Sequence, residues 1–221
     1  MNIPLINRLR RRSQKDIALF QDVLIRIIYE IDPRAEIHGG TAIWRCYGGK
    51  RFSKDIDVYA SSRERWSKTK QLLESSASRY NAKIIKFKET ENVVFIELLL
   101  DDIYSEIEIN FNKYYNDPVI KQYENLDGTF LDILTLSPEA LIDEKISAYN
   151  DRRLITDIYD IYILINFADK KMIENKIRKF ISSIKEPKDL EKEEERLADL
   201  IFEGPILSFA DLVNSIKGRI T

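Results

Sequence analysis

The stretch that decides the fold covers residues 38–59 and reads HGGTAIWRCYGGKRFSKDIDVY. Two adjacent glycines separate a short apolar run, which predicts a strand over 35–38, from a helical pattern over 42–46. Residues 55–59 then alternate polar and apolar side chains, and this alternation predicts the next strand. The segment therefore predicts a strand, a glycine loop, a helix and a second strand, which is an α/β pattern.

Asp55 and Asp57 lie two residues apart on the second predicted strand, so both carboxylates share one face, about 7 Å apart along the backbone. Facing carboxylates repel each other unless a cation lies between them, and oxygen-rich sites of this kind suit Mg²⁺ or Mn²⁺. An isolated Asp-x-Asp is also typical of a solvated edge strand. The glycine loop upstream favours the metal-binding interpretation.

The glycine loop has the features of a phosphate site. Gly39 and Gly40 allow close approach of the backbone to a phosphate, and the helix that follows offers free N–H groups to an anion. Thr41 adds a hydroxyl to this site. Arg51 and Ser53 lie just before Asp55 and Asp57, where an arginine can pair with these aspartates or contact phosphate. Together these residues predict a triphosphate loop beside a metal pair.

A third acid is expected on the strand predicted over 103–111, because a second strand must deliver the base that activates an attacking hydroxyl. Glu106, Glu108 and Asn110 alternate with isoleucines and therefore share a face. We predict that Glu108 is the third metal-binding acid, with Glu106 as the alternative. A solvated hairpin face is the competing interpretation.

Apolar spacing elsewhere predicts a sheet domain followed by helices alone. The predicted helices and strands of the first part cover 14–31, 62–80, 83–88, 92–100 and 103–111. The predicted helices of the second part cover 138–149, 153–168, 170–184, 188–202 and 208–217. The fold class is α/β (α+β): a mixed sheet with flanking helices over residues 1–136, and a helical lobe over residues 137–221 that completes the active-site cleft.

Composition excludes several classes of protein. The 221-residue chain carries 35 basic and 37 acidic residues, and its net charge of −2 indicates no class of partner. A single cysteine, Cys46, excludes an internal disulfide, and no apolar run approaches the roughly 20 residues that cross a bilayer. We therefore expect a soluble, cytoplasmic protein. His38 is the only histidine, and we predict that it packs behind the glycine loop.

The segment 38–59 and the later segment PEALIDEKISAYNDRRLITDIYDIYIL, residues 138–164, resemble the AbiEii/AbiGii family of abortive-infection toxin nucleotidyltransferases. The resemblance covers roughly residues 36–168. That family belongs to the DNA polymerase β-like nucleotidyltransferase superfamily, and here Thr41 replaces its common serine. The resemblance implies that Lys145 holds nucleotide phosphate and that an aspartate follows on the next helix, which either Asp157 or Asp160 matches.

Helical spacing also favours a phosphate-binding role for residues 138–164. Lys145, Tyr149 and Arg152 fall at helical spacings of four and three, so a basic face with an aromatic side chain can bind triphosphate. Asp157 and Asp160, three apart on the next predicted helix, can orient Lys145 through ion pairs. An ordinary ladder of surface salt bridges is the alternative.

We therefore expect a metal-dependent nucleotidyltransferase, in which an acceptor hydroxyl attacks the α-phosphate of a nucleoside triphosphate (NTP). The resemblance implies a toxin of a toxin–antitoxin pair, acting on RNA such as tRNA and neutralised by an antitoxin protein. One alternative is an aminoglycoside-like small-molecule nucleotidyltransferase whose acceptor pocket is lined by Asp101, Asp102 and Glu106. The other is a catalytically silent binding module that retains the fold.

Overall fold

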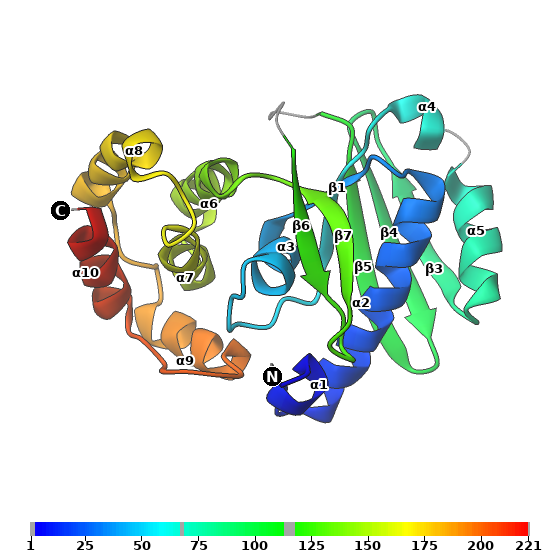
Figure 1. Ribbon diagram of the computed structural model, residues 1–221, viewed down its shortest axis with the longest axis horizontal. Helices are drawn as coiled ribbons and strands as arrows, with labels where there is room; N and C mark the ends of the chain where they lie inside the picture. Colours follow the sequence, from blue (N-terminus) through cyan, green and yellow to red (C-terminus); the bar gives the residue numbers. More distant parts are fainter. Residues whose placement is uncertain (1–2, 67–68, 113–117, 221) are drawn as a thin grey trace.

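A mixed sheet forms the centre of the protein (Figure 1), and the structure, a computed structural model, describes residues 3–66, 69–112 and 118–220. Seven strands lie in the order β3-β4-β5-β2-β1-β7-β6. They are β1 (Glu36–His38), β2 (Ile56–Tyr59), β3 (Lys83–Glu89), β4 (Val93–Leu100), β5 (Ile103–Asn110), β6 (Val119–Glu124) and β7 (Phe130–Thr135). Strand β2 runs parallel to β5, and β1 runs parallel to β7. The other neighbouring strands are antiparallel.

Side-chain alternation gives the central strands one apolar face and one acidic face. Ile56 and Val58 of β2 are fully buried in a core that also holds Ile107 of β5. Asp57 and Glu108 are the intervening residues, so they project from the opposite face. The apolar spacing of the two strands therefore fixes the side of the sheet on which the acidic side chains gather.

Helices cover the two faces of the sheet differently (Figure 1). The helices before residue 80 are α1 (Leu5–Arg8), α2 (Arg12–Ile31), α3 (Gly39–Cys46), α4 (Arg63–Trp66) and α5 (Thr69–Arg79). Those of the second half are α6 (Pro138–Arg152), α7 (Ile155–Leu164), α8 (Lys170–Ser183), α9 (Leu190–Leu200) and α10 (Phe209–Ile220). Helices α2 and α5 lie on the apolar face, and α6–α10 form a lobe beside α3.

The helical lobe shares its core with the sheet domain. Its buried cluster contains Ile43 and Tyr47, which come from α3 and the residue that follows it, together with Leu141, Ile158 and other residues of the lobe. The Tyr47 hydroxyl donates a hydrogen bond to the Leu136 carbonyl oxygen at 2.6 Å. The division at residues 136 and 137 stays a prediction. No helix among the described residues is long and apolar enough to span a membrane.

The predicted mixed sheet with flanking helices is confirmed, with three local differences. The helix predicted over 62–80 is two helices, α4 and α5, and residues 67–68 between them lie outside the described residues. Asp55 immediately precedes β2 rather than beginning it. Strands β6 and β7 were not predicted, because edge strand β6 mixes charged and apolar side chains and keeps only Tyr123 fully buried.

Arg45 on α3 is a buried cation that ties the sheet to two helices. Its side chain donates hydrogen bonds to the carbonyl oxygens of Ala18 at 2.9 Å and Glu124 at 2.8 Å. It also lies 3.2 Å from the carboxylate of Asp22, and its guanidinium stacks over the Trp44 ring. Arg45 and its buried partners stabilise the fold only while all of them are present, because removing one leaves the others buried without partners.

The change Arg45→Met should therefore lower the free energy of unfolding by about 3–5 kcal/mol, because it leaves the buried Asp22 carboxylate without its cation. Urea unfolding followed by circular dichroism measures this loss. Arg79→Met is the control, because Arg79 forms an exposed ion pair with Glu30 and its loss should cost about 1 kcal/mol or less. Equal losses in the two variants would contradict the structural role of Arg45.

Candidate active site

Three strands bring one row of polar side chains to the acidic face. Asp57 of β2 pairs with His38 of antiparallel β1 on one side and with Glu108 of parallel β5 on the other. Asp55 lies two residues before Asp57 on the same face, just ahead of the strand. The register of the sheet, rather than the sequence spacing alone, therefore brings Asp55, Asp57 and Glu108 together.

The acids of this row are held in an unfavourable electrostatic setting. Burial raises the pKa of Asp55, and Glu106 and Asp57 raise it further against the opposing charge of Lys54. Burial and the charge of Asp57 likewise raise the pKa of Glu108. Carboxylates that resist ionisation in this way are stabilised when a cation binds between them.

The donor set suits a divalent metal that is completed by substrate. The Oδ1 atom of Asp55 is buried and has no hydrogen-bond partner, and its ion-pair partner, the Lys54 Nζ, lies 3.8 Å away. Among the described residues, no three Asp, Glu, His or Cys side chains form a ready-made metal site. Mg²⁺ commonly takes one or two carboxylates together with substrate phosphate oxygens and water. Asp55 and Asp57 fit that pattern.

The two glycines are required by close contacts behind the loop. A Cβ atom at Gly39, where φ is +65°, would lie 2.0 Å from Asp57 Oδ2. A Cβ atom at Gly40 would lie 2.5 Å from Ser53 Oγ and 2.9 Å from Arg51 Nη2. Side chains at these two positions would therefore displace three of the predicted site residues.

Thr41 and Gln21 donate hydrogen bonds to the backbone of residues 53–55. Thr41 is fully buried, and its hydroxyl donates a hydrogen bond to the Asp55 carbonyl oxygen at 2.5 Å. The Gln21 side-chain amide on α2 donates to the carbonyl oxygens of Ser53 at 2.9 Å and Lys54 at 3.0 Å. The contact of Thr41 with phosphate stays a prediction, and its observed contact positions Asp55. Gln21 was missed because nothing in a helical pattern marks a buried glutamine.

Two cations of the site share one buried carboxylate. Arg51 donates from Nε to Asp160 Oδ1 at 2.6 Å, and Lys145 Nζ lies 3.0 Å from Asp160 Oδ2. Burial alone would raise the pKa of Asp160, but the charges of Arg51 and Lys145 outweigh it and lower that pKa. The cations are thus held in place from behind, with N–H groups left for an anion in the cleft.

Asp157, about a turn before Asp160 on α7, holds cations in a similar way. It accepts hydrogen bonds from Arg152 Nε at 3.0 Å and Nη2 at 2.7 Å, and it lies 3.7 Å from Lys145 Nζ. Both aspartates therefore contact Lys145, and Asp160 does so at the shorter distance. Which of the two carries the role implied by the family stays a prediction.

His38 does not simply pack behind the loop, because it belongs to a polar network that was not predicted. Its ring stacks on Tyr59 with centroids 3.9 Å apart, and its Nδ1 lies 3.1 Å from a carboxylate oxygen of Glu144. The Tyr59 hydroxyl donates to Glu144 at 2.7 Å. Burial alone would lower the pKa of His38, but Glu144 outweighs it and raises that pKa. The signal available in the sequence was the position of Glu144 next to Lys145.

A hollow of about 430 Å³ lies over the acidic face and contains most of the predicted site. It is lined by nine of the predicted or alternative site residues: Gly40, Arg51, Ser53, Asp55, Asp57, Glu106, Glu108, Lys145 and Arg152. Gly39, Thr41, Asp157 and Asp160 lie behind this lining. Of the three acids considered for a small-molecule acceptor pocket, only Glu106 lines the hollow, because Asp101 and Asp102 form the turn between β4 and β5.

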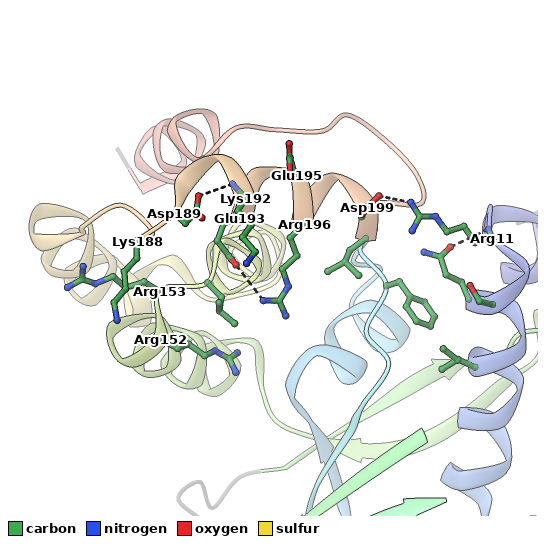
Figure 2. A pocket seen from close by; sticks show the side chains of 16 residues that line it. Arg11, Arg152, Arg153, Lys188, Asp189, Lys192, Glu193, Glu195, Arg196 and Asp199 are labelled. Carbon is green, nitrogen blue, oxygen red and sulfur yellow. Dashed lines mark hydrogen bonds and ion pairs between the residues drawn. The ribbon is translucent and has the colours of Figure 1, made fainter. Parts of the chain in front are cut away.

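A groove of about 760 Å³ continues this hollow toward α9 (Figure 2). Its lining holds six basic and four acidic side chains, and we call it the basic groove. Arg152 and Arg196 line both spaces. Figure 2 shows these two side chains pointing into the same space from α6 and α9. The groove also holds Arg153, Lys188 and Lys192, whose side chains make no ion pair within the described part of the chain.

The buried Asp160 cluster predicts an acid-sensitive fold. The pKa of Asp160 is lowered in the folded protein from its value of 3.8 in the unfolded chain. The carboxylate therefore stabilises the fold at pH values above 3.8, and this contribution is lost as the pH falls from there through the lowered pKa. Asp160→Asn should cost about 3–5 kcal/mol at pH 7 and flatten the loss of stability below about pH 4. Urea unfolding at several pH values measures both effects. Asp199→Asn, at an exposed ion pair, should change neither.

Comparison with known proteins identifies the family of the chain. The family model "Nucleotidyl transferase AbiEii toxin, Type IV TA system" matches residues 27–215. JHP933 from Helicobacter pylori superposes with a TM-score of 0.59 at 17% identity, covering 92% of this chain and 90% of that one. A candidate nucleotidyltransferase from H. pylori gives 0.60 at 15% identity, covering 92% of both chains. No curated protein matches. The chain is a nucleotidyltransferase that belongs to the AbiEii toxin family.

Proposed function

We propose that this nucleotidyltransferase moves a nucleoside monophosphate from an NTP to a hydroxyl of an RNA acceptor such as tRNA, with a bound divalent metal. The observation that carries the proposal is the hollow in which Asp55, Asp57 and Glu108 face Lys145 and Arg152. Carboxylates and cations that line one hollow suit a substrate that brings both phosphate oxygens and their counterion.

Each residue of the hollow has a role in the proposed reaction. Gly40 and Ser53 receive the β- and γ-phosphates, because the missing Cβ of Gly40 lets the Ser53 hydroxyl and the Arg51 guanidinium lie against the loop backbone. Lys145, fixed by Asp160 at 3.0 Å, neutralises charge that develops on the phosphates. Glu108 accepts the proton of the attacking hydroxyl.

The balance of bonds follows from these roles. A bond forms between the acceptor oxygen and the α-phosphorus, and the bond from that phosphorus to the pyrophosphate oxygen breaks. Mg²⁺ or Mn²⁺, held by Asp55 and Asp57 with Glu108 as a third acid, would supply Lewis-acid stabilisation of the phosphate charge. Pyrophosphate leaves toward the basic groove, where Arg152 and Arg196 line the way out.

RNA is the acceptor class that the surface favours. Arg153, Lys188 and Lys192 have no ion-pair partner in the described structure, and they line the groove from the end of α6 and from the start of α9 with the segment before it. Cations without an ion-pair partner beside an active site suit a phosphodiester backbone. Membership of a toxin family further supports regulation by a cognate antitoxin protein.

The first test is transfer of radiolabel from each α-phosphate-labelled NTP to total cellular RNA, with Mg²⁺. Asp57→Asn should reduce labelling at least about a hundredfold, because it removes a predicted metal ligand. Asp132→Asn, at an exposed position on β7, should label like the wild type. Binding of Mn²⁺ followed by paramagnetic resonance should weaken in Asp57→Asn alone. A folded wild type that labels no RNA with any NTP would overturn the RNA-directed version.

The groove is tested by the salt dependence of RNA binding. The double change Lys188→Gln with Lys192→Gln should weaken RNA binding and lower the slope of log affinity against log salt by about 1 for each phosphate that the protein no longer touches. The matched control is Lys170→Gln with Lys179→Gln, at exposed positions of α8 outside the groove. An unchanged slope in the first pair would place the RNA elsewhere.

A further inference from the structure

A second hollow, of about 1060 Å³, lies on the other side of the acidic row. Its lining includes Tyr59 and Asn110. They are the next residues on the same face of β2 and β5 after Asp57 and Glu108. Among the described residues, only Glu108 and Lys145 line both this hollow and the one that holds Gly40 and Ser53. The predicted catalytic acid therefore stands between two separate spaces.

Side chains of helix α6 line both hollows, and their helical spacing decides which hollow each one faces. Lys145 and Arg152, seven residues apart, line the hollow proposed for phosphate. Glu144, Ser147 and Asp151 follow spacings of three and four, and they line the second hollow. The helix therefore presents Lys145 to both spaces, Arg152 to the first, and two carboxylates with a hydroxyl to the second.

The second hollow lacks the chemistry of a phosphate site. Its lining holds three carboxylates, those of Glu108, Glu144 and Asp151, against two basic side chains, Lys145 and His38, and His38 is paired with Glu144. Asn110 accepts a hydrogen bond from the backbone N–H of Asn112 at 2.8 Å, which fixes its amide and leaves the NH₂ group to donate. This lining suits an uncharged group that bears hydroxyls and ring nitrogens, and it repels phosphate.

We propose that the second hollow receives the acceptor: the uncharged terminal nucleoside of an RNA strand, with its free hydroxyl directed at Glu108. In-line displacement at phosphorus requires the attacking oxygen to lie opposite the leaving oxygen. If pyrophosphate leaves on the side of Gly40 and Ser53, the attacking hydroxyl enters from the side of Tyr59 and Asn110. This inference rests on the proposed function and specifies how its acceptor is held.

The rest of the strand has a basic surface within reach. Asp151, near the C-terminal end of α6, lines the second hollow, whereas the next two residues, Arg152 and Arg153, line the basic groove. Arg153 has the left-handed backbone conformation, with φ of +54°, where α6 ends. A strand whose terminal nucleoside occupies the second hollow can therefore pass over this helix end and place its phosphates beside Arg153.

The test uses a short RNA oligonucleotide labelled at its 5′ end, in one version with a 3′-hydroxyl and in another with a 3′-phosphate. Wild-type protein should bind the 3′-hydroxyl form at least about tenfold more tightly, because the second hollow is acidic. Ser147→Trp fills the hollow from the exposed face of α6 and should abolish this preference. Its affinity for Mg²⁺ with a non-hydrolysable NTP should stay unchanged.

One control separates filling of the hollow from a general effect of an added tryptophan. Ser75→Trp, at an exposed serine of α5 on the other face of the sheet, should keep the preference. Loss of NTP affinity in Ser147→Trp with unchanged RNA preference would overturn the inference and assign the hollow to the nucleoside of the NTP. Equal binding of both oligonucleotides by the wild type would also overturn it.

The binding measurements test the acceptor pocket, whereas transfer of label tests the proposed reaction. A wild type that distinguishes the two RNA ends but transfers no label would refute the proposed reaction and leave the acceptor pocket supported. A wild type that binds kanamycin but neither oligonucleotide would overturn the RNA-end assignment and indicate a small cationic acceptor. A raised KM for RNA with unchanged affinity for NTP in Ser147→Trp would support the pocket during turnover.

Discussion

The buried carboxylate of Asp160 is the interaction on which the site depends. It neutralises Arg51 from the segment that leads into Asp55 and Lys145 from α6, so three segments that are distant in sequence are fixed to one point. Desolvation of all three charges is costly, and the arrangement is stable only while every member is present. The benefit is geometric, because two long flexible side chains are held at the cleft before any substrate binds.

The segment that leads into Asp55 also hydrogen-bonds to the C-terminal half of the chain. Arg51 forms an isolated antiparallel bridge with Ile201, and the backbone N–H of Phe52 donates to the Leu200 carbonyl oxygen at 2.9 Å. The backbone N–H of Phe202 donates to the Lys50 carbonyl oxygen at 3.0 Å. The loop that leads into Asp55 is therefore ordered by the segment after α9, and the helical lobe acts as a component of the site rather than as an appendage.

Local pattern was enough for the sheet domain and the helices, because the information lies in side-chain periodicity. The spacing of Ile56 and Val58 predicted a strand, and its alternation already placed Asp57 on the opposite face. Pairings across long separations could not be predicted in this way. His38 meets Glu144 after 106 residues, and Arg51 meets Asp160 after 109. Nothing in one sequence fixes which buried ion will meet which partner.

The same reasoning explains why the acidic row has two different neighbourhoods. Asp57 and Glu108 lie side by side because β2 and β5 run parallel in register, and parallel strands carry the next residues, Tyr59 and Asn110, to the same end of the row. The residues proposed to bind phosphate precede the row, and the uncharged polar side chains of Tyr59 and Asn110 follow it. A reaction that needs a charged leaving group on one side and a neutral hydroxyl on the other finds both along one pair of strands. The direction of the strands thus sets the direction of the proposed attack.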